Sequence, residues 1–362
     1  MYTANPTRYD KMVYNHLGNS GLQLSALGLG LWHNFGSVDP YDNQRAIIQQ
    51  AFDLGITYFD LANNYGPVPG SAEENFGHIL ATDLKPYRDE IVIASKAGYV
   101  MWPGPYGNWG SRKSIIASAD QSLKRMGLDY VDIFYTHRPD PNTDVFETAQ
   151  ALDTLVRQGK ALYIGISNYS GSQTEAIIKC FKQLHTPFVI HQPRYNMFNR
   201  QPEKDLFPVL KANNKAAVGF SSLCQGLLTN KYLNGIPENS RAASSNSPFL
   251  HPSQVEQTLK TVKALNEVAQ SRNQTLAEMA LAWNLRNPEM ACVLIGASRP
   301  EQLVDNVKAL DHLDFSTDEL AQIDQILLLS QGLIGLKLIR HTKRNRQSIR
   351  FLFVAVFMTN HH

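Results

Sequence analysis

The sequence is poor in cysteine and contains no long apolar run. Its three cysteines, Cys180, Cys224 and Cys292, form no CxxC pair and no other metal-type spacing. An odd number of cysteines does not suit a disulfide framework, so we expect a reducing, cytoplasmic location and no metal site. The longest apolar run has eight residues (351–358), whereas a membrane-spanning helix needs about 18. The first twelve residues lack the apolar core of a signal peptide, which agrees with that location.

Charge is modest and unevenly placed along the chain. The formal net charge is +2, but the last segment holds six basic residues, Lys337, Arg340, Lys343, Arg344, Arg346 and Arg350. Without these six, 28 of the 34 basic residues remain against 32 acidic ones, a net charge of −4. A mildly acidic body argues against nucleic acid as the main partner.

Short apolar segments alternate with helical patterns along most of the chain. Eight segments predict strands, at residues 26–30, 57–60, 91–96, 131–137, 161–167, 188–192, 217–221 and 291–296. Amphipathic segments lie between them, for example at 44–53, 114–126, 144–158, 172–183 and 258–272. Apolar strands that alternate with helices predict a parallel sheet buried on both faces. Eight such units favour an α/β fold with one closed (β/α)₈ TIM barrel. An open doubly wound sheet is the alternative, but no GxGxxG fingerprint follows the first strand.

Segments outside this alternation carry separate predictions. Two extended pieces around residues 18–21 predict an N-terminal hairpin that plugs the bottom of the barrel. Long βα loops usually carry function or disorder. The aromatic loop, residues 97–113, is therefore interpreted as a pocket wall, and the polar segment from Leu223 to about Ser253 as a mobile flap. We expect one barrel domain over residues 1–330 and an atypical basic and apolar tail over 331–362, either disordered or a surface anchor.

Polar or titratable side chains end nearly every predicted strand. The strand ends carry Asp60, Lys96, His137, Ser167, Gln192 and Ser221, and Ser298 with Arg299 follow the last strand. Taken singly, each could be a cap, a solvated charge or a core residue. A barrel has its active site at these ends. Aspartate, lysine and histidine on three of them, with Tyr65 close by, therefore indicate a shared catalytic site.

These four side chains suit the reduction of a carbonyl group. A phenol with a pKa near 10 is a weak acid at neutral pH, and the ammonium of Lys96 would lower that pKa by stabilising the phenolate. Asp60 would keep Lys96 charged and oriented, and a neutral His137 would hold the carbonyl oxygen. Tyr65 could then donate a proton while a cofactor delivers hydride.

The same segments resemble the aldo-keto reductase superfamily. "FDLANNYG", "IASKAGY" and "YTHRPD" match its Asp-Tyr-Lys-His tetrad, and "GISNYS", "IHQPRYN", "SSLCQGLLTNKY" and "GASRPEQLVDNV" match its cofactor segments. The likeness covers roughly residues 1–330. It is closest to the branch that contains bacterial reductases of L-glyceraldehyde 3-phosphate and the β subunits of voltage-gated potassium channels. It implies NADPH-dependent reduction of small aldehydes, such as L-glyceraldehyde 3-phosphate and methylglyoxal, by a homo-oligomer.

Carried over to this chain, the resemblance implies a full set of NADPH contacts. Trp32 and Asp60 would approach the nicotinamide, and Ser167, Asn168 and Gln192 would hold its carboxamide. The pyrophosphate would lie over Ser221, Leu223, Gln225, Gly226 and Lys231. The adenosine 2′-phosphate would be held by Ser298, Arg299, Gln302 and Asn306. Separately from the resemblance, the density of tryptophan and tyrosine between two strand ends predicts that Trp32, Tyr65 and Trp102 line a small, partly apolar substrate pocket that admits short aldehydes. The tail departs from the family pattern, which leaves substrate choice open.

Two other functions stay open at this stage. A Schiff-base barrel such as an aldolase would use Lys96 as its nucleophile, but it would leave Arg299 and the nicotinamide-type segments without a purpose. A module that senses NADP(H) and docks a channel is compatible with the intact tetrad. The absence of an N-terminal extension argues against a channel-blocking role.

Overall fold

The computed structural model describes residues 2–238, 240, 242–243 and 250–329. These residues belong to two compact units. The barrel unit comprises Met1–Thr229 and Gln274–Asp314, and the second unit comprises Asn230–Asn273 and Phe315–His362. The predicted tail, 331–362, and part of the predicted flap lie outside the described residues.

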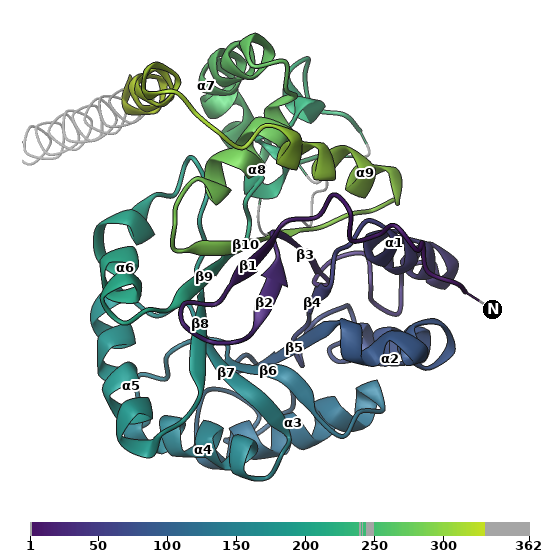
Figure 1. Cartoon of the computed structure of the whole chain (residues 1–362), viewed down its shortest axis with the longest axis vertical. Coiled ribbons are helices and arrows are strands. Elements are labelled where there is room, and N and C mark those ends of the chain that lie inside the picture. Colours follow the sequence, from purple (N-terminus) through teal and green to yellow (C-terminus); the bar gives the residue numbers. More distant parts are fainter. Residues whose placement is uncertain (1, 239, 241, 244–249, 330–362) are drawn as a thin grey trace, which may run out of the picture. The chain divides into compact units, whose positions relative to one another are not determined.

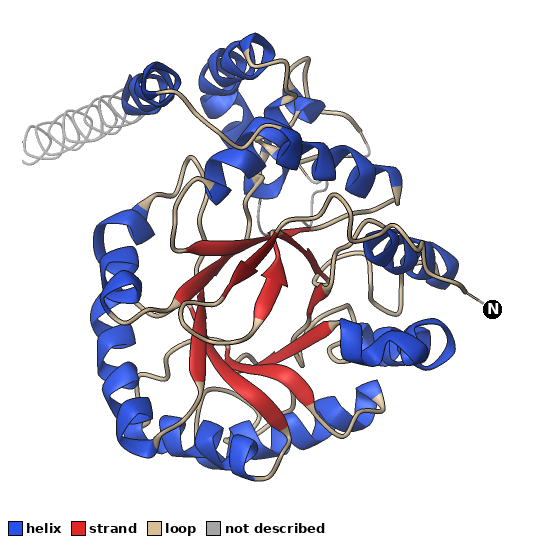
Figure 2. Cartoon of the chain, viewed as in Figure 1, coloured by secondary structure: helices blue, strands red, loops and turns tan. Residues whose placement is uncertain are grey.

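The barrel unit is built on eight parallel strands that close on themselves (Figure 2). They are β3 (Leu27–Gly30), β4 (Tyr58–Asp60), β5 (Val92–Ala97), β6 (Val131–Thr136), β7 (Ala161–Ser167), β8 (Phe188–Gln192), β9 (Ala216–Gly219) and β10 (Met290–Ile295). Strand β10 pairs with both β9 and β3, which closes the ring. The predicted (β/α)₈ TIM barrel is confirmed, the open sheet is excluded, and each strand overlaps a predicted segment.

Helices surround the strands (Figure 1). In the barrel unit they are α1 (Tyr41–Asp53), α2 (Ser71–Ile79), α3 (Arg112–Met126), α4 (Val145–Arg157), α5 (Gly171–Leu184), α6 (Gln201–Ala212), α8 (Leu276–Leu285) and α9 (Glu301–Val307). Short helical turns add η1 (Leu80–Leu84), η2 (Lys85–Glu90), η3 (Cys224–Gly226) and η5 (Lys308–Asp311). Local sequence fixes their ends: Asp144 caps α4 through the N–H of Phe146, and Gly127 ends α3 with a φ of 65°.

The N-terminal hairpin closes one end of the barrel. Strands β1 (Tyr14–His16) and β2 (Gln23–Ser25) pair antiparallel. Leu17 and Leu24, from the turn and the second strand, are buried in the same apolar cluster as the side chains that fill the barrel. The predicted plug is confirmed.

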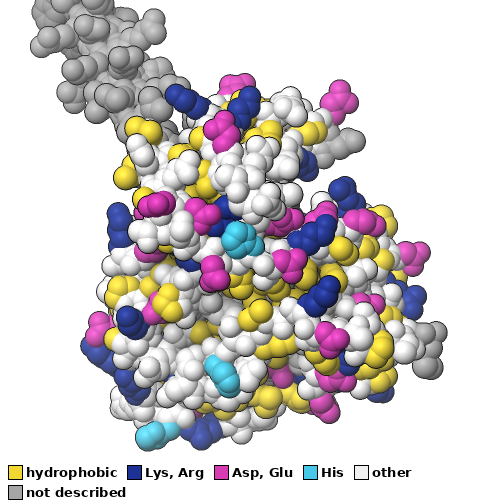
Figure 3. Space-filling view, turned by 45° about the horizontal axis from the view of Figure 1, so that its top comes forward, with side chains coloured by type: hydrophobic (Ala, Val, Ile, Leu, Met, Phe, Trp, Pro, Cys, Tyr) yellow, Lys and Arg dark blue, Asp and Glu magenta, His cyan; other side chains and the backbone are white. Residues whose placement is uncertain are grey.

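The second unit contains η4 (Asn230–Tyr232), α7 (Pro252–Ser271) and a helix that starts at residue 317. Arg272 links its two parts, with an ion pair to Glu319 at 2.8 Å and a cation–π contact at 3.7 Å from the ring centroid of Phe315. None of the described helices is long and apolar enough to cross a membrane. On the face shown in Figure 3, acidic and basic side chains are interspersed, which does not favour a nucleic-acid surface.

Candidate active site

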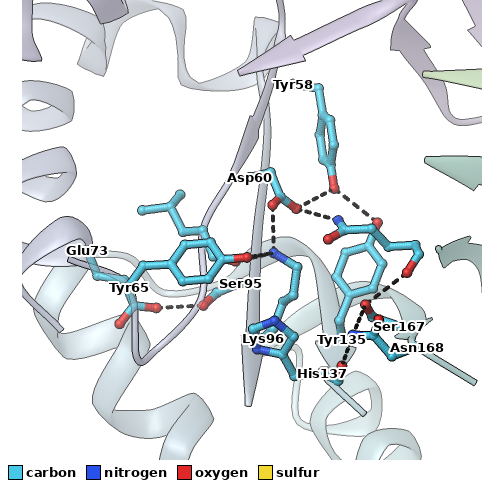
Figure 4. A network of polar contacts seen from close by, with 12 residues as sticks. Tyr58, Asp60, Tyr65, Glu73, Ser95, Lys96, Tyr135, His137, Ser167 and Asn168 are labelled. Atoms are coloured by element: carbon cyan, nitrogen blue, oxygen red, sulfur yellow. Dashed lines mark hydrogen bonds and ion pairs between the residues drawn. The ribbon is translucent and has the colours of Figure 1, made fainter. Parts of the chain in front are cut away.

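A line of hydrogen bonds joins Asp60, Lys96 and Tyr65 where β4 and β5 end (Figure 4). The Nζ of Lys96 donates to Oδ2 of Asp60 at 2.6 Å and to the phenol oxygen of Tyr65 at 3.2 Å. A third donation goes to the carbonyl oxygen of Leu61 at 2.7 Å. Asp60 is therefore in contact with Lys96, where it could anchor the ammonium as the sequence predicts. Because β4 pairs with β5 in the barrel, the two strand ends place these side chains together.

The lysine is held in a fully desolvated place. The side chain of Lys96 has no exposed surface, and that of Asp60 is 2% exposed. Burial lowers the pKa of Lys96, and the charge of Asp60 and its hydrogen bond oppose that shift. Behind the lysine, Glu73 accepts from Ser95 at 2.5 Å and pairs with Arg125 at 2.7 Å. The buried charges of this region are thus paired, as buried charges must be.

Asp60 is also held from its other side. Its Oδ1 accepts from the hydroxyl of Tyr58 at 3.0 Å and from Nε2 of Gln192 at 2.8 Å. The hydroxyls of Tyr58 and Tyr135 lie 3.0 Å apart. Burial raises the pKa of both phenols well above 10, so they stay protonated and can donate. The carboxylate is therefore oriented by neutral donors as well as by Lys96.

Two glycines make room for these two tyrosines. A Cβ at Gly28 would lie 2.6 Å from the ring of Tyr58, and one at Gly165 would lie 2.3 Å from the ring of Tyr135. Gly165 stands opposite Tyr135 in the β6–β7 register. The sequence analysis had left Tyr58 and Tyr135 among apolar strand residues. One signal was available: Tyr58 precedes Asp60 by two positions in one strand, so both side chains point to the same face.

The pKa of Tyr65 differs from the sequence-based expectation. It lies well above 10, because burial, then the charge of Asp60 and the neighbouring Tyr99, raise it. The net direction is thus opposite to the lowering of the pKa that the ammonium of Lys96 alone predicts. Desolvation outweighs the cation, and the phenol keeps its proton at neutral pH.

His137 lies beside Tyr65, with ring centroids 5.8 Å apart at 72°. Its pKa is well below 6.5, because burial and then the charges of Lys96 and Arg138 disfavour the imidazolium. The imidazole is therefore neutral, as the sequence analysis expected. Its buried Nδ1 has no hydrogen-bond partner among the described residues. This ring nitrogen can therefore form a hydrogen bond with a ligand.

The three residues predicted to hold a carboxamide lie together at the ends of β7 and β8. Asn168 Nδ2 donates to the carbonyl of His137 at 3.0 Å and to Oγ of Ser167 at 3.2 Å. Ser167 Oγ donates to the carbonyl of Gln192 at 2.9 Å. Within the described part of the chain, the side-chain oxygens of Asn168 and Gln192 accept no hydrogen bond. Both oxygens can therefore accept a hydrogen bond from a ligand, which suits the NH₂ group of a carboxamide.

The predicted phosphate contacts fall in separate places. Ser221, Leu223, Gln225 and Gly226 follow β9 in a tight turn, where Ser221, Cys224, Gln225 and Gly226 have φ values of 56°, 46°, 59° and 93°. Lys231 belongs to the second unit. Ser298, Arg299 and Gln302 lie exposed or partly exposed around the start of α9, and Asn306 is buried within it. Arg299 is 66% exposed and only 3.7 Å from Glu301. The N–H and hydroxyl of Ser298 donate to Oε1 of Gln302, so the exposed guanidinium of Arg299 is the group in this set whose chemistry suits a phosphate dianion.

The aromatic residues expected in the substrate pocket separate into two groups. Trp32 lies 6.4 Å from Tyr65, centroid to centroid. In the described structure Trp102 makes no ring contact with either of them. Tyr99, which the sequence analysis did not select, packs edge-on against His137 at 4.6 Å. The aromatic loop thus reaches the tetrad through Tyr99.

Comparison with known proteins shows the family of this chain. The model of the Aldo/keto reductase family matches residues 26–328. L-glyceraldehyde 3-phosphate reductase of Escherichia coli K12 is 56% identical over 329 residues, which are 90% of this chain and 95% of the relative. A probable voltage-gated potassium channel subunit beta of Oryza sativa is 36% identical over 327 residues (89% and 97%). A putative one of Schizosaccharomyces pombe is 38% identical over 326 residues (87% and 93%). The chain therefore belongs to the aldo/keto reductase family and is an oxidoreductase.

Proposed function

We propose that this chain reduces small aldehydes, L-glyceraldehyde 3-phosphate and methylglyoxal among them, to alcohols with NADPH, and that Tyr65 donates the proton. The observation that carries this proposal is the buried line Asp60–Lys96–Tyr65 beside a neutral imidazole. The name of the 56% identical relative supports the substrate class.

Each side chain has a role that follows from its surroundings. The raised pKa of Tyr65 keeps the phenol protonated at neutral pH, so its proton is present when the aldehyde binds. As the phenol gives its proton to the aldehyde oxygen, negative charge grows 3.2 Å from the Nζ of Lys96. A buried, fixed cation at that place stabilises the phenolate. Neutral His137 can donate a second hydrogen bond to the same aldehyde oxygen.

The residues present fit a nicotinamide cofactor. When bound, NADPH would supply the hydride that reduces the carbonyl carbon. The free side-chain oxygens of Asn168 and Gln192 would accept from the carboxamide. Arg299, with Ser298 and Gln302, would contact the 2′-phosphate, because a guanidinium suits a phosphate dianion. The buried Nδ1 of His137 has no hydrogen-bond partner among the described residues, which supports the presence of a ligand site here.

The contacts of Lys96 disfavour the aldolase alternative. A Schiff-base lysine has to present a neutral amine to its substrate. The Nζ of Lys96 instead forms an ion pair at 2.6 Å and donates to two further oxygens. All three of its N–H groups are thus used.

A second candidate function is an NADP(H)-sensing module of the channel β-subunit type. It is favoured by the 36–38% identity to channel subunits over nearly the full chain. Such a module would bind the cofactor without needing rapid turnover. Cofactor binding and aldehyde turnover therefore have to be measured separately.

The test uses the purified full chain, NADPH and a panel that holds glyceraldehyde 3-phosphate, methylglyoxal and a bulky steroid ketone. We expect turnover of the small aldehydes and little of the ketone. Tyr65→Phe keeps the ring but removes the acid, so it should bind NADPH normally and transfer hydride roughly 10²–10⁴-fold more slowly in a single turnover. Tight NADPH binding with no turnover of any aldehyde would favour the sensing module instead.

A further inference from the structure

Arg138, the residue after His137, is held rigidly by the aromatic loop. Its guanidinium carbon lies 3.6 Å from the ring centroid of Trp109 and 4.3 Å from that of Tyr99. Nε donates to the carbonyl of Gly98 at 2.9 Å, and Nη2 donates to Oδ1 of Asn108 at 2.8 Å. Two ring contacts and two hydrogen bonds therefore fix both the place and the orientation of this cation.

The charge of Arg138 has no counter-ion in the part of the chain that the structure describes. Among the described residues, no carboxylate lies within ion-pair distance of it. The nearby Asp140 instead accepts from the N–H of Gly110 at 3.0 Å and from the hydroxyl of Thr143 at 2.6 Å. Of the five N–H groups of a guanidinium, three have no acceptor in the described part of the chain. A half-buried cation of this kind is suited to an anionic ligand.

This free cation lies close to the tetrad. The ring of Tyr99 is 4.6 Å from the ring of His137 and 4.3 Å from the guanidinium carbon, which sets an upper limit of about 9 Å between the imidazole and the guanidinium. A three-carbon aldehyde with a terminal phosphate spans roughly 5 Å from carbonyl carbon to phosphorus, at about 1.5 Å per bond. Such a molecule can contact both groups at once.

The backbone of the loop supports a functional role for this arrangement. Trp109 has a φ of 66°, a left-handed conformation that costs a bulky residue about 1–2 kcal/mol. Its N–H bonds to the same Gly98 carbonyl that accepts from Arg138. The strained residue thus presents its indole to the guanidinium, and strain of this kind is concentrated at functional sites.

We propose that Arg138, clamped by Tyr99 and Trp109, is a phosphate subsite that selects short aldehydes with a terminal phosphate. This inference rests on the proposed aldehyde reduction and deepens it. The free edge of the guanidinium binds the phosphate oxygens, while the aldehyde oxygen lies between Tyr65 and His137. A fixed arginine fork matches phosphate geometry better than a flexible ammonium does.

The experiment compares kcat/KM for glyceraldehyde 3-phosphate and for unphosphorylated glyceraldehyde. The variants are Arg138→Met and Arg138→Lys, with Arg157→Met, an arginine that is 61% exposed on α4, as the matched control. We expect Arg138→Met to lower the ratio of the two kcat/KM values roughly 10- to 100-fold, the loss of charge-assisted hydrogen bonds, mainly through KM for the phosphorylated aldehyde. Arg138→Lys should give an intermediate ratio, and Arg157→Met should keep the parent ratio.

Competition in the parent protein provides a second, mutation-independent readout. Glycerol 3-phosphate should inhibit glyceraldehyde reduction competitively in the parent and far less in Arg138→Lys, whereas glycerol should not inhibit either protein. An equal loss for both aldehydes in the Arg138 variants, or no inhibition of the parent by glycerol 3-phosphate, would overturn the subsite. A parent that reduces neither aldehyde would instead overturn the proposed function.

Discussion

Variants of the buried ion pair between Asp60 and Lys96 can separate its contribution to stability from its contribution to catalysis. The pair is 2.6 Å long, with side chains that are 2% and 0% exposed. Three variants test it: Asp60→Asn, Lys96→Met and the double variant. Each single change leaves one buried charge without its partner, whereas the double variant buries no charge from this pair.

The structure sets the expected size and order of the effects. Removing one partner of a buried pair costs about 3–5 kcal/mol of unfolding free energy. Lys96→Met should fall at the lower end, because Asp60 keeps its donors Tyr58 and Gln192. Asp60→Asn should fall at the upper end, because the ammonium then has only neutral acceptors, in a place where burial already lowers its pKa. The double variant should lose less than the sum of the two, by roughly 1–3 kcal/mol.

The assay is urea unfolding of the four proteins, combined with single-turnover hydride transfer at saturating NADPH. Stability should recover in the double variant relative to Asp60→Asn, but hydride transfer should remain as slow as in Lys96→Met, because Tyr65 has lost its cation in both. Strictly additive losses of stability would refute the dependence of each charge on the other. A double variant with the parent rate would refute the role of Lys96.

Three further predictions follow from other parts of the structure. Arg299→Ala should weaken NADPH binding far more than NADH binding, because only NADPH carries the 2′-phosphate; fluorescence titration with both cofactors measures this. Burial lowers the pKa of His191 from 6.5 to about 3, so between these values the unfolded chain binds a proton that the folded protein does not. Stability should therefore be full above pH 6.5 and fall as the pH drops toward 3; urea titrations should show a shallower fall for His191→Gln but not for the exposed His78→Gln. Gly165→Ala places a Cβ 2.3 Å from the ring of Tyr135, so it should lower both melting temperature and activity, whereas Gly21→Ala, with open space around it, should change neither.

The sequence predicted the barrel and the core of the candidate site for a physical reason. Each buried strand is a short apolar run, and several strands end in a polar residue, such as Asp60, Ser167 and Gln192, at the end of the barrel where active sites lie. Asp60 and Lys96 lie at or next to the ends of the paired strands β4 and β5, so the pairing of these strands brings them to 2.6 Å. Periodicity and strand-end chemistry were sufficient for this part.

The residues that surround and orient the tetrad could not be predicted from the sequence in the same way. Tyr58 and Tyr135 look like core residues in an apolar strand, and only the space left by Gly28 and Gly165 shows why their hydroxyls reach one another. The pKa of Tyr65 depends on how completely packing removes water from it. Desolvation is a property of the assembled structure, so sequence spacing alone led to the opposite direction.

The aromatic loop, residues 97–113, would influence substrate choice, whereas the tetrad would carry out the reduction. Its composition predicted a pocket wall, with Trp102 as the contact, whereas the structure presents Tyr99 to His137 and Trp109 to Arg138. A loop without periodicity gives no rule for which side chain points inward, and the left-handed backbone at Trp109 has no sequence signature. Strands β4 and β5 carry Asp60 and Lys96, and Tyr65 and His137 follow β4 and β6; every carbonyl substrate would use these four side chains. The loop orients Arg138, the cation that we propose for binding a phosphorylated aldehyde, so changes in this loop should alter which aldehyde is reduced without altering how it is reduced.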